Sequence, residues 1–241
     1  GAIIMKTPVM IALDFESVEE LQSFLKQFPS HLKLTVKIGM ELFYGQGPQI
    51  VRNLRQKGHA VSLDLKLHDI PNTVEKAMFQ LGKLGIQYTT VHALGGKPMI
   101  QAAKRGLMAG ARAAKVPAPK LLAVTELTSI SERQLQEEQN VPLKMNEQVQ
   151  KLAQLAENAG ADGVICSPHE VAQLKPVLPA DFLYVTPGIR MPDAKKDDQQ
   201  RVMTPAEAQK AGSSALVVGR PITKAADPVV AYQKIVESMQ D

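Results

Sequence analysis

Short runs of apolar, often β-branched residues alternate along this chain with longer segments whose apolar residues recur at helical spacing. Eight of the short runs predict β-strands, at residues 9–15, 34–39, 60–67, 88–94, 120–127, 163–167, 182–189 and 215–219. The first longer segment is an example of the helical spacing, with an apolar face made of Val18, Leu21, Phe24, Leu25 and Phe28. Ser17 is the predicted N-cap of this helix, and Glu20 is its predicted capping-box partner.

Glycine residues stand where four of the helices are expected to end, just before the next strand: Gly58, Gly85, Gly160 and Gly212. A left-handed C-terminal cap favours glycine at such a position. The strict alternation of strand and helix predicts parallel strands joined by right-handed crossovers. Eight such units close naturally into an α/β fold, a single (β/α)8 TIM barrel, and a doubly wound open sheet is the alternative. The first strand lacks the glycine-rich turn of a dinucleotide-binding sheet, which favours the barrel.

The length of the chain fits one barrel. Its 241 residues are close to the ~250 typical of that fold, and no break in composition marks a second domain. Because translation does not start at glycine, we expect residues 1–4 to be a remnant of cloning and Met5 to be the natural start. Residues 5–241 are then expected to form a single catalytic barrel domain.

Composition narrows the class of protein. Cys166 is the only cysteine, so neither an internal disulfide nor a cysteine-type zinc site is possible, and we expect a cytoplasmic protein. No apolar run approaches the ~20 residues of a membrane span. Tryptophan is absent and the basic residues are spread along the chain, which argues against nucleic-acid binding. The net charge of +4 suits an anionic substrate, although a solvated surface explains it at least as well.

Polar residues gather at the predicted strand ends. In a barrel enzyme the chemistry lies at the C-terminal ends of the strands, whereas the strand interiors pack. Seven of the eight predicted ends carry polar or turn-forming residues, namely Asp14, Lys37, Asp64, Lys66, His92, Thr128, Ser129, Pro187, Gly188, Arg190, Gly219 and Arg220. Together they predict a site at that end of the barrel. His68 and His92 lie close to it, but no carboxylate stands at ligand spacing from them, so we predict no metal ion.

The third predicted strand carries charges on one face. Side chains alternate between the two faces of a strand, so Val61, Leu63, Leu65 and Leu67 are expected to pack under helices. Ser62, Asp64 and Lys66 are then expected to point into the barrel. Buried charges are unfavourable unless they pair, and a structural ion pair would explain Asp64 and Lys66 alone. With Lys37 on the neighbouring strand and Asp69 just beyond, four alternating charges indicate a functional constellation.

An anion site is predicted at the last strands. Gly219 lets backbone N–H groups approach an anion, and the Arg220 guanidinium can clamp it through two hydrogen bonds. In another fold, a Gly-Arg pair after a strand would indicate only an ordinary surface turn. Barrels, however, often bind phosphate at the loops after strands seven and eight. The loop at residues 190–200 has no apolar periodicity, so it is either a solvated loop or a lid at the barrel mouth. Arg190 and Gln199 lie at its two ends, within reach of a bound anion if a lid closes.

The chain resembles the bacterial orotidine 5′-phosphate decarboxylase family along essentially its full length from Met5. The third-strand decapeptide is the most specific stretch, and its combination with the last two is close to diagnostic. The matching stretches are residues 11–14 (Ile-Ala-Leu-Asp), 36–39 (Val-Lys-Ile-Gly), 64–73 (Asp-Leu-Lys-Leu-His-Asp-Ile-Pro-Asn-Thr), 91–96 (Val-His-Ala-Leu-Gly-Gly), 127–129 (Leu-Thr-Ser), 186–190 (Thr-Pro-Gly-Ile-Arg) and 218–222 (Val-Gly-Arg-Pro-Ile). Glu126 is less usual for the family than an apolar residue, but it does not weaken the resemblance.

The resemblance implies conversion of orotidine 5′-monophosphate to uridine 5′-monophosphate and CO2, the last step of de novo UMP synthesis, without metal or organic cofactor. It also implies a homodimer with shared sites, in which one subunit supplies Lys37, Asp64 and the proton donor Lys66. The other subunit supplies Asp69, Ile70 and Thr73. The implied substrate contacts are Asp14, Lys37 and Thr73 for the ribose, Ser129 for the pyrimidine edge with Thr128 and Pro187 nearby, and Arg190, Gln199, Gly219 and Arg220 for the phosphate.

Two other functions remain open on the sequence. Magnesium-dependent sugar-phosphate enzymes of the same superfamily, hexulose-phosphate synthase and keto-gulonate-phosphate decarboxylase, share the Asp-x-Lys-x-x-Asp run. The segment Ile70-Pro71-Asn72-Thr73 and the long loop from Arg190 argue against them. A catalytically silent barrel that binds a nucleotide or a partner protein is the other alternative. Retention of four unfavourable buried charges argues against a silent protein.

Overall fold

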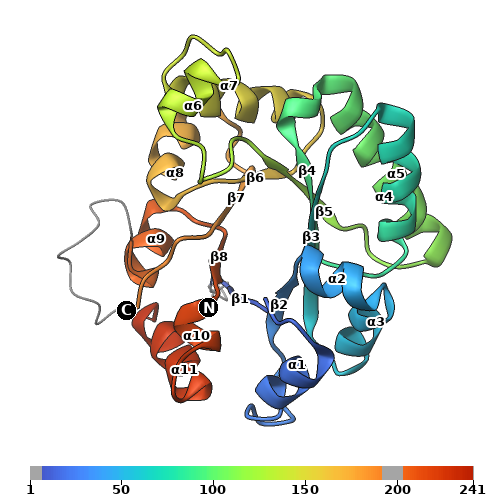
Figure 1. The fold of residues 1–241 in the computed structure, drawn as a ribbon, viewed down its shortest axis with the longest axis vertical. Coiled ribbons are helices and arrows are strands. Elements are labelled where there is room, and N and C mark those ends of the chain that lie inside the picture. Colours follow the sequence, from blue (N-terminus) through green and yellow to red (C-terminus); the bar gives the residue numbers. More distant parts are fainter. Residues whose placement is uncertain (1–6, 192–202, 241) are drawn as a thin grey trace.

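Eight parallel strands form a closed barrel in this protein. The computed structural model describes residues 7–191 and 203–240, so the predictions for residues 1–4 and for Gln199 lie outside the described residues. The strands pair in sequence order and β8 returns to pair with β1, which confirms the barrel and excludes the open sheet (Figure 1). The strands are β1 (Val9–Ala12), β2 (Thr35–Ile38), β3 (Ala60–Leu67), β4 (Tyr88–His92), β5 (Lys120–Val124), β6 (Gly163–Ile165), β7 (Leu183–Thr186) and β8 (Ala215–Val218).

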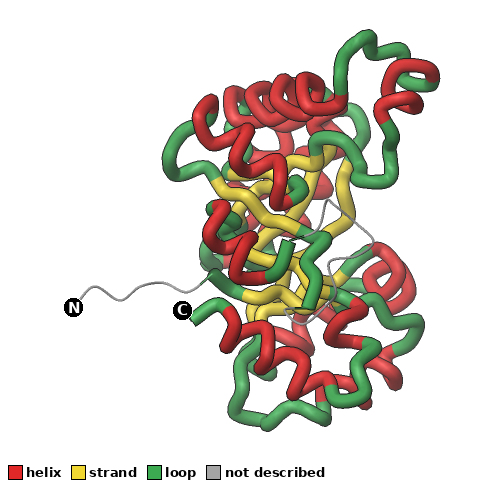
Figure 2. The backbone as a smooth tube through the Cα atoms, turned by 90° about the vertical axis from the view of Figure 1, so that its left-hand side faces the viewer, coloured by secondary structure: helices red, strands yellow, loops and turns green. Residues whose placement is uncertain are grey.

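The helices surround the barrel on its outer face, as Figures 1 and 2 show from two directions. They are α1 (Val18–Leu25), α2 (Met40–Gln46), α3 (Gln49–Gln56), α4 (Pro71–Gly82), α5 (Lys97–Ala114), α6 (Glu132–Glu137), α7 (Met145–Asn158), α8 (Pro168–Leu174), α9 (Pro205–Ala211), α10 (Arg220–Thr223) and α11 (Pro228–Ser238), with short 3₁₀ turns at Ala93–Gly95 and Lys175–Val177. Within the described ranges, no helix is long and apolar enough to cross a membrane.

Most strands end earlier than the sequence predicts. Seven of the eight strands end one to three residues before the predicted C-terminal limit, and only β3 matches it. The apolar runs continue past the last ladder hydrogen bond because the first loop residues still pack against the barrel. Leu13 is an example, since it is fully buried although β1 ends at Ala12. The polar residues after these runs therefore lie on loops above the barrel.

The local signals at the helix ends are largely confirmed. The Ser17 hydroxyl accepts a hydrogen bond from the Glu20 N–H at 3.2 Å, as an N-cap should. The second hydrogen bond of a capping box would run from the Ser17 N–H to the Glu20 carboxylate. Here the Glu20 carboxylate instead accepts from the N–H of the preceding residue, Glu16, at 3.4 Å. The four glycines expected to end helices all have left-handed backbone, with φ of +89°, +70°, +102° and +109° at Gly58, Gly85, Gly160 and Gly212.

The core has two parts. The larger part fills the layer between the sheet and the helices. The smaller part lies inside the barrel and consists of Met10, Ala12, Tyr88, Leu122, Val185, Ala215 and Val217. This inner cluster fills the barrel as a packed floor, so open space remains only toward the C-terminal ends of the strands.

The close packing of α4 against α5 fixes the position of the segment that follows β3. Gly106 and Gly110 of α5 face the backbone carbonyls of Glu75 and Phe79 on α4 so closely that a Cβ atom at either glycine would clash. Any larger residue would push the helices apart. The two glycines therefore fix α4, whose N-terminus directly follows the charged run from Asp64 to Asp69.

Candidate active site

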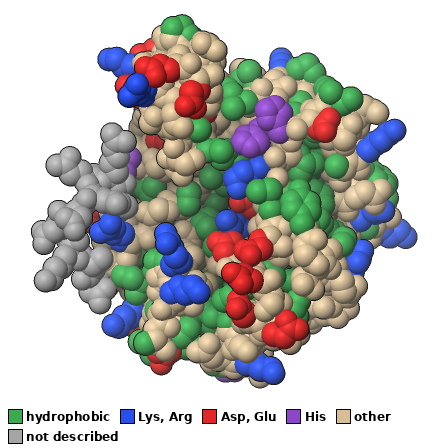
Figure 3. Space-filling model, in the orientation of Figure 1, with side chains coloured by type: hydrophobic (Ala, Val, Ile, Leu, Met, Phe, Trp, Pro, Cys, Tyr) green, Lys and Arg blue, Asp and Glu red, His purple; other side chains and the backbone are tan. Residues whose placement is uncertain are grey.

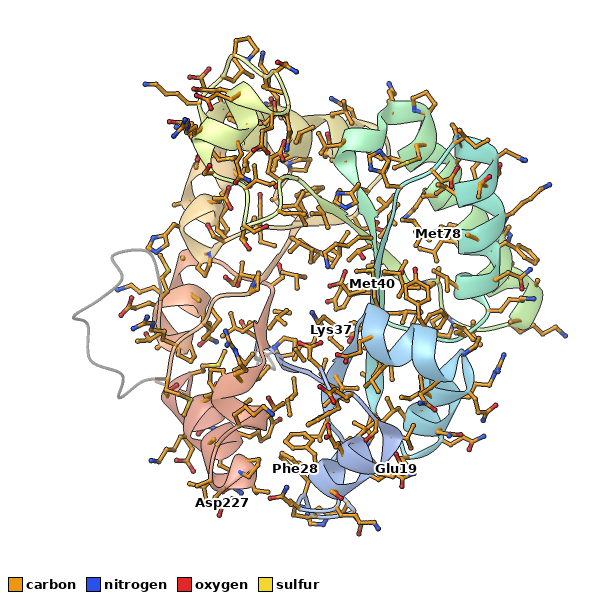
Figure 4. All side chains as sticks on the ribbon, in the orientation of Figure 1. Glu19, Phe28, Lys37, Met40, Met78 and Asp227 are labelled. Carbon is orange, nitrogen blue, oxygen red and sulfur yellow. The ribbon has the colours of Figure 1, made fainter. Side chains whose placement is uncertain are left out.

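A pocket of about 210 Å³ opens at the C-terminal end of the barrel. Its floor is the inner apolar cluster, and its walls carry five predicted site residues, namely Lys37, Asp64, Lys66, Thr128 and Pro187. The space-filling view shows this end of the molecule as a hollow with apolar side chains inside and charged ones beside it (Figure 3). Lys37 extends from β2 toward the interior of the barrel (Figure 4).

Three of the predicted charges meet in this pocket. One carboxylate oxygen of Asp64, Oδ2, accepts hydrogen bonds from Lys66 Nζ at 2.8 Å and from Lys37 Nζ at 3.4 Å. The side chains are 12% exposed for Asp64, 29% for Lys66 and 21% for Lys37, so all three are shielded but within reach of a ligand. The pocket thus holds two cations and one anion around a single carboxylate oxygen.

The backbone of β3 bulges where these charges lie. Leu63 pairs with Thr89 and Leu67 pairs with Val91, so four steps along β3 match only two along β4. Lys66 has left-handed backbone with φ of +51°, a conformation that costs about 1–2 kcal/mol for a residue with a side chain. The predicted inward direction of Asp64 and Lys66 is confirmed, but the regular alternation assumed for residues 60–67 is wrong beyond Asp64.

The surroundings of Asp64 favour its charged form. Burial alone would raise the pKa of this carboxyl, but Lys37, the hydrogen bond from Lys66 and the hydrogen bond from Thr90 outweigh it, and the pKa lies below the ordinary value of 3.8. Asp64 therefore carries its negative charge at neutral pH, and the lysines that surround it are held as its counter-ions.

This lowered pKa predicts an acid-sensitive fold. A group whose pKa is lower in the folded state stabilises the protein above its unfolded pKa, and the contribution is lost as pH falls below that value. The melting temperature of the wild type should thus drop as the pH is lowered through about 4. The melting temperature of Asp64→Asn should drop less steeply over the same range. Thermal melts at a series of pH values measure this, with Asp181→Asn at an exposed site as the control. Equal acid slopes for the wild type and Asp64→Asn would contradict the assignment.

Asp69 lies apart from the three charges. Its side chain is exposed, and its Oδ1 accepts the N–H of the next residue, Ile70, at 2.6 Å. Within the described part of the chain it makes no ion pair with Lys37 or Lys66. Ile70 is 65% exposed and Thr73 is exposed in the first turn of α4. A single subunit thus brings three of the four predicted charges together, and the placement of Asp69 in the partner's site stays a prediction.

The remaining predicted residues lie around the pocket mouth. Asp14 is exposed and its carboxylate lies beside Gly39, directly after β2. Ser129 follows Thr128 on the exposed loop between β5 and α6. Gly219 and Arg220 start α10 directly after β8, at the same end of the barrel.

Arg190 lies where the long loop leaves the barrel. Its backbone N–H donates to the carbonyl of Met203 at 3.1 Å, and Ile189 forms a parallel β-bridge with Met203. The two stems of the loop are thereby joined, which holds Arg190 at the barrel mouth beside the end of β7. Gln199 falls within the loop and outside the described residues.

The sequence gives no signal for two further residues of the pocket wall. Thr90 is buried on β4 and contacts both Asp64 and Lys66. Glu126 is 8% exposed, and its two carboxylate oxygens accept hydrogen bonds from the side-chain amides of Gln139 and Gln148, both at 3.1 Å. Glu126 therefore ties the segment after β5 to α7 and to the segment after α6.

Loss of the Glu126 carboxylate should destabilise the protein. Glu126→Leu would leave the Gln139 and Gln148 amides without their acceptor in a largely buried place, at a cost of about 2–4 kcal/mol. Urea unfolding measures this difference, and Glu126→Gln, which keeps one amide oxygen as acceptor, should lose less. A loss below about 1 kcal/mol for Glu126→Leu would show that the two hydrogen bonds do not hold this wall.

A histidine pair lies next to the charges. The rings of His68 and His92 are 5.4 Å apart between centroids. Burial, followed by the proximity of His68 and Lys66, lowers the pKa of His92 below 6.5, so its ring is neutral at pH 7. Among the described residues, no group of three or more histidine, cysteine, aspartate or glutamate side chains is placed to hold a metal ion. The absence of a metal from the reaction stays a prediction.

Comparison with known proteins shows which family this chain matches. The model of the Orotidine 5′-phosphate decarboxylase / HUMPS family matches residues 7–235. Orotidine 5′-phosphate decarboxylase of Lactiplantibacillus plantarum is 58% identical over 231 residues, which cover 96% of this chain and 98% of that protein. The crystal structure of orotidine 5′-phosphate decarboxylase from Lactobacillus acidophilus has a TM-score of 0.87 at 50% identity, over 98% of this chain and all of that one. The enzyme of that name from Pyrococcus horikoshii, at 23% identity and a TM-score of 0.75, shares the fold.

Proposed function

The chain belongs to the orotidine 5′-phosphate decarboxylase / HUMPS family, and we propose from this premise that it converts orotidine 5′-monophosphate to uridine 5′-monophosphate and CO2. Relatives with more than half of their residues identical over nearly the whole chain bear the name of this enzyme. The observation that carries the proposal is the position of Lys66 Nζ, 2.8 Å from the Asp64 carboxylate in a pocket with an apolar floor.

The reaction needs strong stabilisation of a carbanion. Loss of CO2 from C6 of the pyrimidine leaves an electron pair in an sp² orbital, outside the π system of the ring. Since no delocalisation is available, the enzyme must lower the barrier by on the order of 20 kcal/mol. A cation fixed beside C6 supplies such stabilisation, because its charge is already oriented when the negative charge develops.

Lys66 is the group that we assign to this task. As an ammonium it stabilises the charge at C6 and then donates a proton to that carbon, so that the C–CO2 bond breaks and a C–H bond forms. Asp64 holds the Lys66 amine in place through the hydrogen bond between them. Lys37 contacts the same carboxylate oxygen.

Asp64 also opposes the substrate carboxylate. Two like charges ~4 Å apart at an effective dielectric near 20 repel each other by about 4 kcal/mol. Binding elsewhere must offset this repulsion, and the phosphate contacts are the available source. We assign these contacts to Arg190, Gly219 and Arg220 at the ends of β7 and β8, together with Gln199.

The remaining contacts follow the rim of the pocket. We assign the ribose hydroxyls to Asp14, Lys37 and Thr73, and the pyrimidine edge to Ser129. Thr128 and Pro187 line the pocket on the side of β5 and β7, where the base would lie against them. These contacts leave the apolar floor beneath C6, which suits the departing CO2 because that molecule is uncharged.

We further propose that the enzyme is a homodimer with sites shared between subunits. Four large apolar side chains are exposed on the loops and helices that follow β2, β3 and β4, namely Met40 (50%), Tyr44 (70%), Ile70 (65%) and Leu94 (41%). Exposed apolar side chains that gather after neighbouring strands at the barrel mouth are typical of a protein interface. Asp69 lies among them without an ion pair to Lys66 in its own chain, which suits a role in the site of the partner.

Mixing two inactive variants tests the shared site. In a dimer of Lys66→Ala with Asp69→Ala, one site carries both substitutions and the other site carries neither. Random exchange of subunits in an equal mixture should therefore restore about a quarter of the wild-type activity. The measurement is turnover before and after subunit exchange, and two batches of Lys66→Ala mixed together serve as the control. Activity that stays at the level of the separate variants would place both residues in the same subunit's site.

The substrate class separates this proposal from its rivals. The wild-type protein should consume orotidine 5′-monophosphate in an absorbance assay and should be inactive with the sugar phosphates of hexulose-phosphate synthase and keto-gulonate-phosphate decarboxylase. Activity with a sugar phosphate alone would assign the chain to the other branch of the family. Nucleotide binding without turnover would indicate the silent barrel.

We also infer a single catalytic domain at residues 5–241 that works in the cytoplasm. The direct pairing of β1 with β8 supports one cooperative barrel, since the ends of the chain complete the same sheet. The presence of only one cysteine, Cys166, suits a reducing compartment.

A further inference from the structure

Thr90 lies directly beside the bulge of β3 and contacts the two central charged residues of the site. It belongs to β4, its side chain is only 3% exposed, and it lines the pocket. The register places it opposite the bulge, because its neighbours Thr89 and Val91 pair with Leu63 and Leu67. The threonine thus faces the stretch of β3 that has left the regular ladder.

The Thr90 hydroxyl makes two hydrogen bonds of defined direction. It accepts the backbone N–H of Lys66 at 2.9 Å, since an amide N–H can only donate. It donates to Oδ1 of Asp64 at 2.7 Å, since an ionised carboxylate can only accept. One oxygen atom therefore joins the backbone of the proton donor to the side chain of its counter-ion.

For Asp64 the bond fixes the orientation of the carboxylate plane. Thr90 occupies Oδ1, and Lys66 and Lys37 share Oδ2. A rotation of the carboxylate about its terminal bond would break the Thr90 bond and both lysine contacts together. The hydroxyl thereby holds one carboxylate oxygen toward the two lysines.

For Lys66 the bond supports a strained backbone. The bulge removes its N–H from the backbone ladder, and a buried N–H without an acceptor is unfavourable by about 1–3 kcal/mol. The Thr90 hydroxyl takes the place of the missing ladder carbonyl and helps to maintain the left-handed φ of +51°. This conformation determines the direction in which the Lys66 side chain leaves the strand.

We propose that Thr90 is a positioning residue of the reaction, which sets Lys66 and Asp64 relative to each other through a hydroxyl that bridges the bulge of β3. It does not transfer a proton to the substrate and acts only through the two residues that it holds. The inference rests on the proposed function, because it assigns a role in the same decarboxylation.

The neighbouring threonine supplies a matched control. Thr89 lies next to Thr90 on β4, is fully buried and donates its hydroxyl hydrogen to the carbonyl of Leu63 on β3 at 2.9 Å. Its bond also joins β4 to β3 but touches neither Asp64 nor Lys66. Thr89→Val and Thr90→Val therefore remove one buried hydroxyl each, with the same change of shape, and differ in the contact that is lost.

The test is the steady-state turnover of orotidine 5′-monophosphate by the full-length wild type, Thr90→Val, Thr90→Ser and Thr89→Val. Thr90→Val should lower kcat by about 100-fold with KM within about threefold of the wild type, since valine keeps the shape of the pocket. Thr90→Ser keeps the hydroxyl and should retain kcat within about threefold. Thr89→Val should lower the melting temperature while keeping kcat.

Three results would overturn the proposal. They are an unchanged kcat in Thr90→Val, an equal loss of kcat in Thr89→Val, and a failure of Thr90→Ser to restore turnover. If Thr90→Val does not fold, Thr90→Ala replaces it with the same expected loss, because alanine also lacks the hydroxyl. An inactive wild type would instead refute the proposed decarboxylation, so the two failures are distinguishable in one assay.

Discussion

Lys66→Ala is expected to lower kcat for orotidine 5′-monophosphate by at least about 10⁴-fold. The substitution removes both the charge that stabilises the carbanion and the proton that C6 receives, and each of these effects alone is worth about 10²–10⁴-fold. The fold should survive, because alanine in the left-handed conformation is no more strained than lysine and Asp64 keeps its contact with Lys37. Single-turnover kinetics at saturating substrate, with a thermal melt of the same sample, measures both expectations.

Lys104→Ala is the matched control for this experiment. Lys104 forms an ion pair of 2.6 Å with Asp162, and its side chain is 28% exposed compared with 29% for Lys66. Its substitution removes a similar shielded lysine from a similar pair, outside the pocket, so kcat should stay close to that of the wild type. Substantial turnover by Lys66→Ala would show that another group donates the proton.

Arg220→Ala is expected to lower kcat/KM by about 10³-fold, with a decrease in kcat as well as a rise in KM. A guanidinium that binds phosphate through two charged hydrogen bonds contributes several kcal/mol. If this binding energy offsets the repulsion at Asp64, its loss must slow the chemical step and not only weaken binding. Initial rates over a wide range of substrate concentration separate the two constants.

Arg133→Ala controls for the removal of an arginine. Arg133 pairs with Glu137 on the surface of α6, with its side chain 83% exposed, and its loss should leave both constants unchanged. An effect of Arg220→Ala on KM alone would show that the phosphate contacts bind substrate and transition state equally. An unchanged kcat/KM would remove Arg220 from the phosphate site.

The sequence predicted the barrel well because both of its signals are local. Each strand appears as an apolar run, and each of the four glycines expected to end a helix has the backbone that such an end requires. The direction of Asp64 followed from alternation along a single strand. The strand ends were less predictable, since buried loop residues such as Leu13 continue the apolar run beyond the last ladder hydrogen bond.

The bulge of β3 could not be found from the sequence. The bulge includes a hydrogen bond from the Lys66 N–H to the hydroxyl of Thr90, which is 24 residues away along the chain. The two residues come into contact only when β3 and β4 pair. The structural role of Glu126 was hidden for the same reason, because its partners Gln139 and Gln148 come from two later segments. The position of Asp69 outside the charged cluster likewise depends on where α4 begins after the strand.

The central claim is that this chain decarboxylates orotidine 5′-monophosphate without a metal ion and protonates C6 from a group of the protein. The most direct test is turnover by chelator-treated protein in D2O, with CO2 and uridine 5′-monophosphate both quantified. The account predicts equal amounts of the two products, one deuterium at C6 of the nucleotide and no change on addition of magnesium. A requirement for magnesium, or release of CO2 without uridine 5′-monophosphate, would contradict it.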